Sequence, residues 1–107
     1  MFRRFLLFSM LSLIAALPVG ARSEGLQMVM VEQPGCHWCA RWNEEIAPIY
    51  PRTEAGEVAP LRRIDLRADV PEDLTLDRPA VFTPTFILVD DGVEFGRIEG
   101  YPGEDFF

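Results

Sequence analysis

The chain has 107 residues, of which 49% are hydrophobic, and its formal net charge at pH 7 is −7. This length accommodates one domain at most. An acidic surface without a basic patch repels nucleic-acid phosphates, so we expect no nucleic-acid partner. Composition and charge therefore exclude a multidomain enzyme and a nucleic-acid-binding protein.

The N-terminus has the features of a secretory signal peptide. Two arginines precede an uncharged, largely apolar run over residues 5–19, and small residues follow it. We expect cleavage after Ala21, so that residues 1–21 are removed, the domain spans residues 22–107, and nothing stays inserted in the membrane. An uncleaved anchor is the alternative, but Pro18 ends the run before the roughly 20 apolar residues that a spanning helix needs. Loss of both arginines lowers the net charge by two, to −9.

The first half of the domain has the pattern strand, helix, strand. Residues 26–31 are apolar on both faces, which predicts a central strand. Residues 61–66 carry charges and predict a strand near an edge, after a polar connector over residues 52–60. Between the strands, Pro48 should kink or end a helix that begins at Cys36. Apolar positions three and four residues apart predict the core face of this helix: Cys39, Trp42, Ile46 and Ile49.

The second half predicts a β-hairpin. Residues 71–74 favour a short helical turn, and residues 86–89 are an apolar strand. Asp91-Gly92 is a strong hairpin signal, and residues 93–98 alternate as an antiparallel edge strand does. Residues 104–107 are typical of the first turn of a helix that continues further. The expected fold class is α/β, with a mixed four-stranded sheet made of a βαβ unit and a hairpin, and flanking helices.

The only two cysteines, Cys36 and Cys39, lie two residues apart at the predicted start of the helix. A disulfide between them closes a loop of only four residues and so stabilises the fold little, by about 2 kcal/mol on the loop-entropy scale. A helix N-terminus stabilises a thiolate, because its unpaired N–H groups point at the anion. The pair therefore favours reversible disulfide chemistry over a structural role.

Metal roles are the alternative interpretation of this pair. A structural zinc site needs four ligands, and covalent haem attachment needs histidine directly after Cys39, where Ala40 stands. Copper(I) binding by the two cysteines with Met28 or Met30 stays possible, although strand methionines more often belong to a core. We expect no cofactor and no resident metal.

The order of these elements, with Cys36-x-x-Cys39 after the first strand and Thr83-Pro84 before the third, resembles the thioredoxin fold over residues 26–107. Residues 31–65 are also similar to small exported bacterial thioredoxin-like proteins, some of which accompany periplasmic sulfur-oxidation (Sox) systems. The resemblance implies a periplasmic thiol–disulfide oxidoreductase that reduces or exchanges disulfides in exported proteins and draws on a membrane electron donor. A copper-handling or partner-docking module with the same fold is the alternative.

The resemblance also implies roles for single residues. Cys36 corresponds to the attacking cysteine and Cys39 to the resolving one. Pro84 corresponds to a cis-proline that contacts the substrate together with Thr83. His37 is a candidate for tuning the redox potential, with a bystander role as the alternative.

Trp38, between the cysteines, is a candidate contact for partner proteins. The sequence also departs from the family's pattern at two positions. Met30 stands where the family has a buried acid, and Leu61 stands where a basic residue often accompanies that acid. Glu32 is then a candidate proton acceptor for Cys39, with an ordinary half-exposed glutamate as the alternative.

Overall fold

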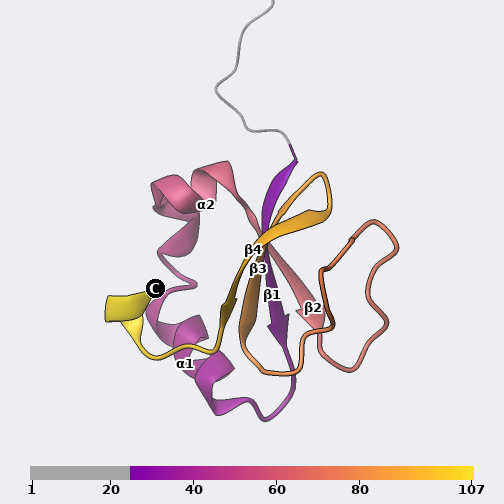
Figure 1. The fold of residues 1–107 in the computed structure, drawn as a ribbon. Helices are drawn as coiled ribbons and strands as arrows, with labels where there is room; N and C mark the ends of the chain where they lie inside the picture. The colour runs from indigo at the N-terminus through magenta and orange to yellow at the C-terminus, as the bar shows by residue number, and fades with distance from the viewer. Residues whose placement is uncertain (1–24) are drawn as a thin grey trace, which may run out of the picture.

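The computed structural model describes residues 25–107, so the predicted signal peptide lies outside the described residues. A four-stranded sheet has the order β2-β1-β3-β4 (Figure 1). The first strand is parallel to the second and antiparallel to the third, which pairs antiparallel with the fourth. This confirms the predicted mixed sheet and its central first strand. The strands are β1 (Leu26–Glu32), β2 (Leu61–Asp65), β3 (Thr85–Asp90) and β4 (Val93–Glu99).

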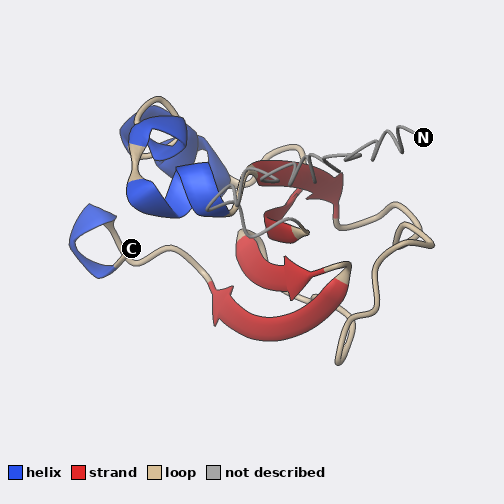
Figure 2. Ribbon diagram, turned by 90° about the horizontal axis from the view of Figure 1, so that it is seen from above, coloured by secondary structure: helices blue, strands red, loops and turns tan. Residues whose placement is uncertain are grey.

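The helical segments gather on one side of the sheet (Figure 2). They are α1 (His37–Glu45), η1 (Tyr50–Arg52), α2 (Glu54–Val58) and η2 (Glu104–Phe106), of which η1 and η2 are 3-10 turns. None of the helices within residues 25–107 is long and apolar enough to cross a membrane.

The prediction of a polar connector over residues 52–60 was wrong, because this segment contains α2. The Thr53 hydroxyl caps the helix by accepting a hydrogen bond from the backbone N–H of Gly56 at 3.0 Å. The negative charges of Glu54 and Glu57 in the first turn stabilise the helix, because they lie at the positive end of its dipole. Threonine followed by acidic residues was therefore the signal that could have identified this helix.

The predicted core face of α1 is correct for Cys39, Trp42 and Ile46, but wrong for Ile49, which is 52% exposed. The helix ends at Glu45, so the chain has already left the helical path before Pro48. Tyr50 takes the core position instead, and its hydroxyl donates a hydrogen bond to the carbonyl of Ala59. The expected helical turn over residues 71–74 is a single hydrogen-bonded turn and not a helix.

Alternation along β1 separates two cores. Met28 and Met30 face α1 and pack with Cys39, Trp42 and Phe86. Val29 and Val31 face the other way, where the β2–β3 connection lies beside the sheet (Figure 1). The core on that face also contains Leu74, Ile87 and Val89. The central strand is thus covered on both faces, which is why its four buried residues, 28–31, are all apolar.

A buried ion pair on this second face makes stability depend on pH. Burial alone would raise the pKa of Glu94, but hydrogen bonds from Arg97 and from the backbone N–H of Asp77 hold it below its ordinary value of 4.5. The folded state then binds fewer protons than the unfolded state as pH falls below 4.5. We expect the stabilising contribution of Glu94 to be complete above this pH and to be lost as pH falls through the lowered pKa.

Urea unfolding of the wild type and of Glu94→Gln at several pH values tests this expectation. The variant should be less stable at pH 7, and the difference in unfolding free energy should shrink on acidification below pH 4.5. A difference that stays constant down to pH 3 would contradict the assignment.

Candidate active site

Cys36 and Cys39 lie at the N-terminus of α1, where β1 delivers the chain through a tight turn. Gly35 has a φ of 78°, a conformation that glycine adopts without a steric penalty. Cys36 is the N-cap residue, and its Sγ accepts a hydrogen bond from the backbone N–H of Cys39 at 3.1 Å. The two cysteines form a disulfide with their Cα atoms 5.2 Å apart.

The two sulfur-bearing residues differ in exposure. Cys39 belongs to the core between the sheet and α1, which contains Met28, Met30, Trp42 and Phe86 and is called the helix-side core below. Cys39 is 4% exposed, whereas Cys36 is half-buried at the margin of this core. A partner that approaches from solvent therefore meets Cys36 first. The helix N-terminus also supplies the backbone N–H that contacts the Cys36 sulfur, which favours a negative charge there.

The segment before β3 lies against the turn that precedes the cysteines. The Thr83–Pro84 peptide bond is cis, and Pro84 is fully buried. The side-chain amide of Gln33 donates a hydrogen bond to the Thr83 hydroxyl at 2.9 Å, while the Gln33 carbonyl accepts one from the N–H of Cys36. Gln33 thus joins the two segments that the sequence singled out separately.

Apolar side chains are exposed on both segments. Trp38 is 46% exposed, with the His37 ring 5.2 Å away and the Arg41 guanidinium 5.6 Å from its ring centre. Val81 and Phe82, directly before Thr83, are 68% and 58% exposed. Exposed aromatic and aliphatic groups of this kind are suited to contact a protein partner.

Glu32 lies at the end of β1, on the strand face that carries Met30. Its carboxylate forms an ion pair with Arg63 of β2 at 2.5 Å. The same guanidinium lies 3.5 Å from the sulfur of Met30 and 5.8 Å from the ring centre of Trp42. A charged pair is therefore present on the helix side of the sheet, and its carboxylate comes from the residue two positions after Met30 on the same face of β1.

A second charged cluster holds the end of α1. Glu45 accepts hydrogen bonds from Arg41 and from the Tyr101 hydroxyl, the latter at 2.8 Å. The hydrogen bond from Arg41 lowers the pKa of Glu45 and raises that of Arg41. Burial, followed by the hydrogen bond to Glu45, raises the pKa of Tyr101 to about 12. The cluster ties α1 to the segment after β4.

Two residues that hold candidate site residues were not identified from the sequence: Gln33, which holds Thr83, and Arg63, which holds Glu32. Each acts through a partner that is remote in the chain, 50 residues away for Gln33 and 31 for Arg63. Met28 and Met30, the other candidate copper ligands, are 7% and 0% exposed in the helix-side core. Over residues 25–107, no group of three or more histidine, cysteine, aspartate and glutamate side chains could hold a metal ion.

Comparison with solved structures finds a match over most of the chain. The crystal structure of the periplasmic thioredoxin SoxS from Paracoccus pantotrophus, in its reduced form, is 57% identical in sequence. The match covers 77% of this chain and 86% of that one, with a TM-score of 0.75. No family model matches the chain, and a search of curated proteins finds no relative.

Proposed function

Because this chain belongs to the thioredoxin family, we propose that Cys36 attacks the disulfide of a protein substrate and that Cys39 resolves the resulting mixed disulfide. The chain is a periplasmic thiol–disulfide oxidoreductase, and its partners are protein thiols and disulfides. The observation that carries these two roles is the asymmetry of the pair. Cys36 is half-buried at the helix N-terminus, whereas Cys39 is buried in the core.

In the reducing direction, the Cys36 thiolate attacks one sulfur of the substrate disulfide, and the other substrate sulfur leaves as a thiolate that takes up a proton. Cys39 then loses its proton and attacks Cys36 Sγ, which releases the second substrate thiol. The substrate gains two electrons and two protons, and the protein ends with the Cys36–Cys39 disulfide. Renewed turnover needs two electrons from outside, and we propose a membrane electron-donor protein as their source.

We further propose that Thr83 and Pro84 contact the substrate chain. The hydrogen bond from Gln33 to Thr83 supports this role, because it joins their segment to the turn that bears Cys36. Trp38, exposed beside the reactive pair, adds an apolar contact for the partner protein.

Glu32 is proposed to accept the proton of Cys39, directly or through water, and His37 to tune the redox potential. The position of Glu32 on the strand face of Met30 supports its role, since Met30 and Cys39 belong to one core. Arg63 holds the Glu32 carboxylate there. His37 is exposed and directly follows the attacking cysteine, which limits it to a modest electrostatic influence.

The alternative of a copper-handling module is not favoured. Copper(I) prefers soft ligands, and beyond the two cysteines this chain offers only Met28 and Met30 close by in sequence. Both are core residues, so binding by either would require the helix-side core to open.

The Cys39→Ser variant tests the proposed roles of the two cysteines. Without the resolving thiol, the mixed disulfide on Cys36 cannot be released internally, so partner proteins should accumulate covalently on the variant. Non-reducing electrophoresis of the variant purified from the periplasm measures the adducts. Dithiothreitol should release the partner proteins, because it reduces the mixed disulfide. The control, Cys36→Ser/Cys39→Ser, should carry none. If no adduct forms and the wild type also fails to reduce insulin, the proposed function is wrong.

A further inference from the structure

Arg97 of β4 lies buried beneath the connection between β2 and β3. Its side chain is 6% exposed and that of Glu94 is 1% exposed. The guanidinium donates hydrogen bonds to both oxygens of the Glu94 carboxylate, from Nε at 2.6 Å and from Nη2 at 3.2 Å. Bidentate pairing fixes the plane of the guanidinium, so its remaining donors point in defined directions.

Those remaining donors bind the connection. Arg97 Nη2 donates to the carbonyl of Arg78 at 2.7 Å, and Nη1 donates to the carbonyl of Pro79 at 3.4 Å. Glu94 in turn accepts a hydrogen bond from the backbone N–H of Asp77 at 2.9 Å. The ion pair therefore holds three consecutive residues of the connection by their backbone alone.

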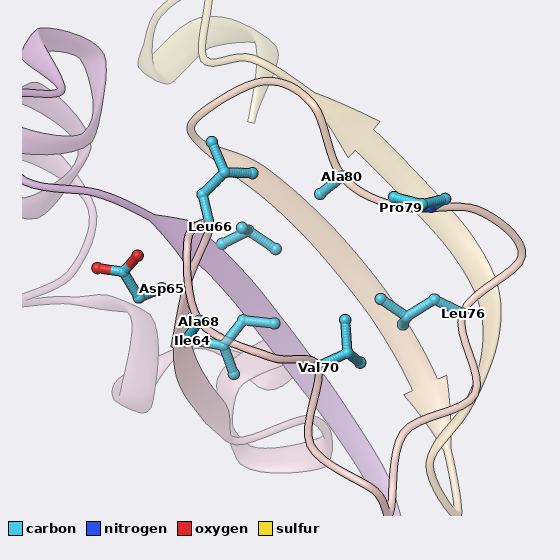
Figure 3. A pocket seen from close by; sticks show the side chains of 9 residues that line it. Ile64, Asp65, Leu66, Ala68, Val70, Leu76, Pro79 and Ala80 are labelled. Atoms are coloured by element: carbon cyan, nitrogen blue, oxygen red, sulfur yellow. The ribbon is translucent and has the colours of Figure 1, made fainter.

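Apolar packing supplies only part of what holds this segment. Pro79 and Ala80 line a pocket of about 70 Å³, together with Leu66 and Leu76 (Figure 3). Part of the space beneath the segment is open, although Ala80 packs against the core on this face. The hydrogen bonds from Arg97, together with the ion pair of Arg78 and Glu99 at 2.9 Å, therefore contribute to the position of the segment.

The held segment leads directly into the proposed substrate contact. Four residues after Pro79, Thr83 receives the hydrogen bond from Gln33, and the Pro84 carbonyl accepts one from the N–H of Gly100 at 2.8 Å. Between Pro79, which Arg97 holds, and Thr83, which Gln33 holds, the chain exposes Val81 and Phe82. The path of Val81 and Phe82 is thus determined at one end by β3 and β4 and at the other by Arg97.

We propose that Arg97, oriented by Glu94, is a positioning residue that sets the segment 80–84 against the reactive cysteines and so determines the affinity for protein substrates. The proposal rests on the proposed function, because it assumes that Thr83 and Pro84 contact the substrate. It assigns to Arg97 no part in the exchange of electrons.

The Arg97→Lys variant tests this role. A lysine ammonium can keep the charge opposite Glu94, but it cannot also reach two carbonyls with a planar fork. Loss of these charge-assisted hydrogen bonds should raise KM for insulin about tenfold, with kcat within about twofold of the wild type. Reduction of a small disulfide, 5,5′-dithiobis(2-nitrobenzoate), and the redox potential in glutathione buffer should not change.

Two controls separate the possible failures. Arg62→Lys weakens the ion pair with Asp73, which lies elsewhere on the same connection. This variant should leave KM for insulin and the reduction of the small disulfide unchanged. Pro84→Ala tests the premise. If it leaves KM for insulin unchanged, the proposed substrate contact is wrong. If it raises KM while Arg97→Lys does not, the proposed function survives and only the role of Arg97 is wrong.

Equal losses with insulin and with the small disulfide would also overturn the proposal, because they would indicate a general loss of structure. If Arg97→Lys does not unfold cooperatively, the KM for insulin is measured on the double variant Glu94→Leu/Arg97→Met instead. Apolar replacement of a whole buried ion pair often preserves stability, while here it removes the three hydrogen bonds that the Glu94 and Arg97 side chains make to the connection. The same selective rise in KM for insulin is expected, and its absence in this folded variant would contradict the role of Arg97.

Discussion

The Cys36→Ser variant should lose disulfide exchange by at least ~10³-fold, because a serine hydroxyl neither ionises near pH 7 nor forms a disulfide. Cys39 cannot take over the attack, since it is 4% exposed and faces the helix-side core. The rate of insulin reduction, followed by turbidity with dithiothreitol as the electron source, measures the loss. Far-UV circular dichroism should be unchanged, because the disulfide closes only a short loop.

The matched comparison is Glu32→Gln, which removes the proposed proton acceptor but keeps both thiols. Loss of a general base typically costs 10² to 10⁴ in rate, and water can replace it in part, so we expect a slowing of about 10²-fold at neutral pH. The mixed disulfide should then accumulate, because only its resolution by Cys39 is impaired. Activity of Cys36→Ser close to that of the wild type would exclude Cys36 as the nucleophile, and unchanged kinetics of Glu32→Gln would exclude Glu32 as the acceptor.

The Trp42→Ala variant should have the largest effect on stability, with a loss of about 3–5 kcal/mol in the free energy of unfolding. Trp42 is fully buried and joins three aromatic rings, with centroids at 5.0 Å from Phe86, 5.7 Å from Phe107 and 6.3 Å from Tyr50. A domain of this size is stabilised by only about 5–10 kcal/mol in total, so the variant should be close to unfolding at 37 °C. Guanidinium denaturation followed by circular dichroism measures the effect.

Two substitutions calibrate this result. Trp42→Phe keeps an aromatic ring, and the indole N–H that it removes has no hydrogen-bond partner among the described residues, so the loss should stay well below that of alanine. Trp38→Ala removes an exposed side chain of the same type and should change stability by less than about 0.5 kcal/mol. A loss for Trp42→Ala no larger than that for Trp38→Ala would contradict the assignment of Trp42 to the core.

Local patterns identified the framework of this domain. The largely apolar run over residues 26–31 predicted the central strand, because a strand covered on both faces buries consecutive apolar side chains. Alternation over residues 93–98 and the turn at Asp91-Gly92 predicted the hairpin for a similar reason. Ile49 was assigned wrongly because helical spacing continues in the sequence after the helix itself has ended.

The short helix α2 was missed although its signal is local. Thr53 and the acids after it mark a helix start, but the segment has too few apolar residues to show a periodic face. Gly56 carries the tertiary reason for its place, because a Cβ there would lie 1.8 Å from the carbonyl oxygen of Tyr50. Close packing against η1, and not amphipathic character, thus positions α2.

The cysteine pair, its place at the start of a helix and the strands that flank it could all be predicted from the sequence, since each depends on residues close together in the chain. The groups that surround the pair could not be predicted, because they come together only in the folded domain. Gln33 meets Thr83 across 50 residues, Arg63 meets Glu32 across 31, and Arg97 meets the carbonyl of Arg78 across 19. Such pairs follow from the register between strands and the path of a long connection, which local spacing does not contain.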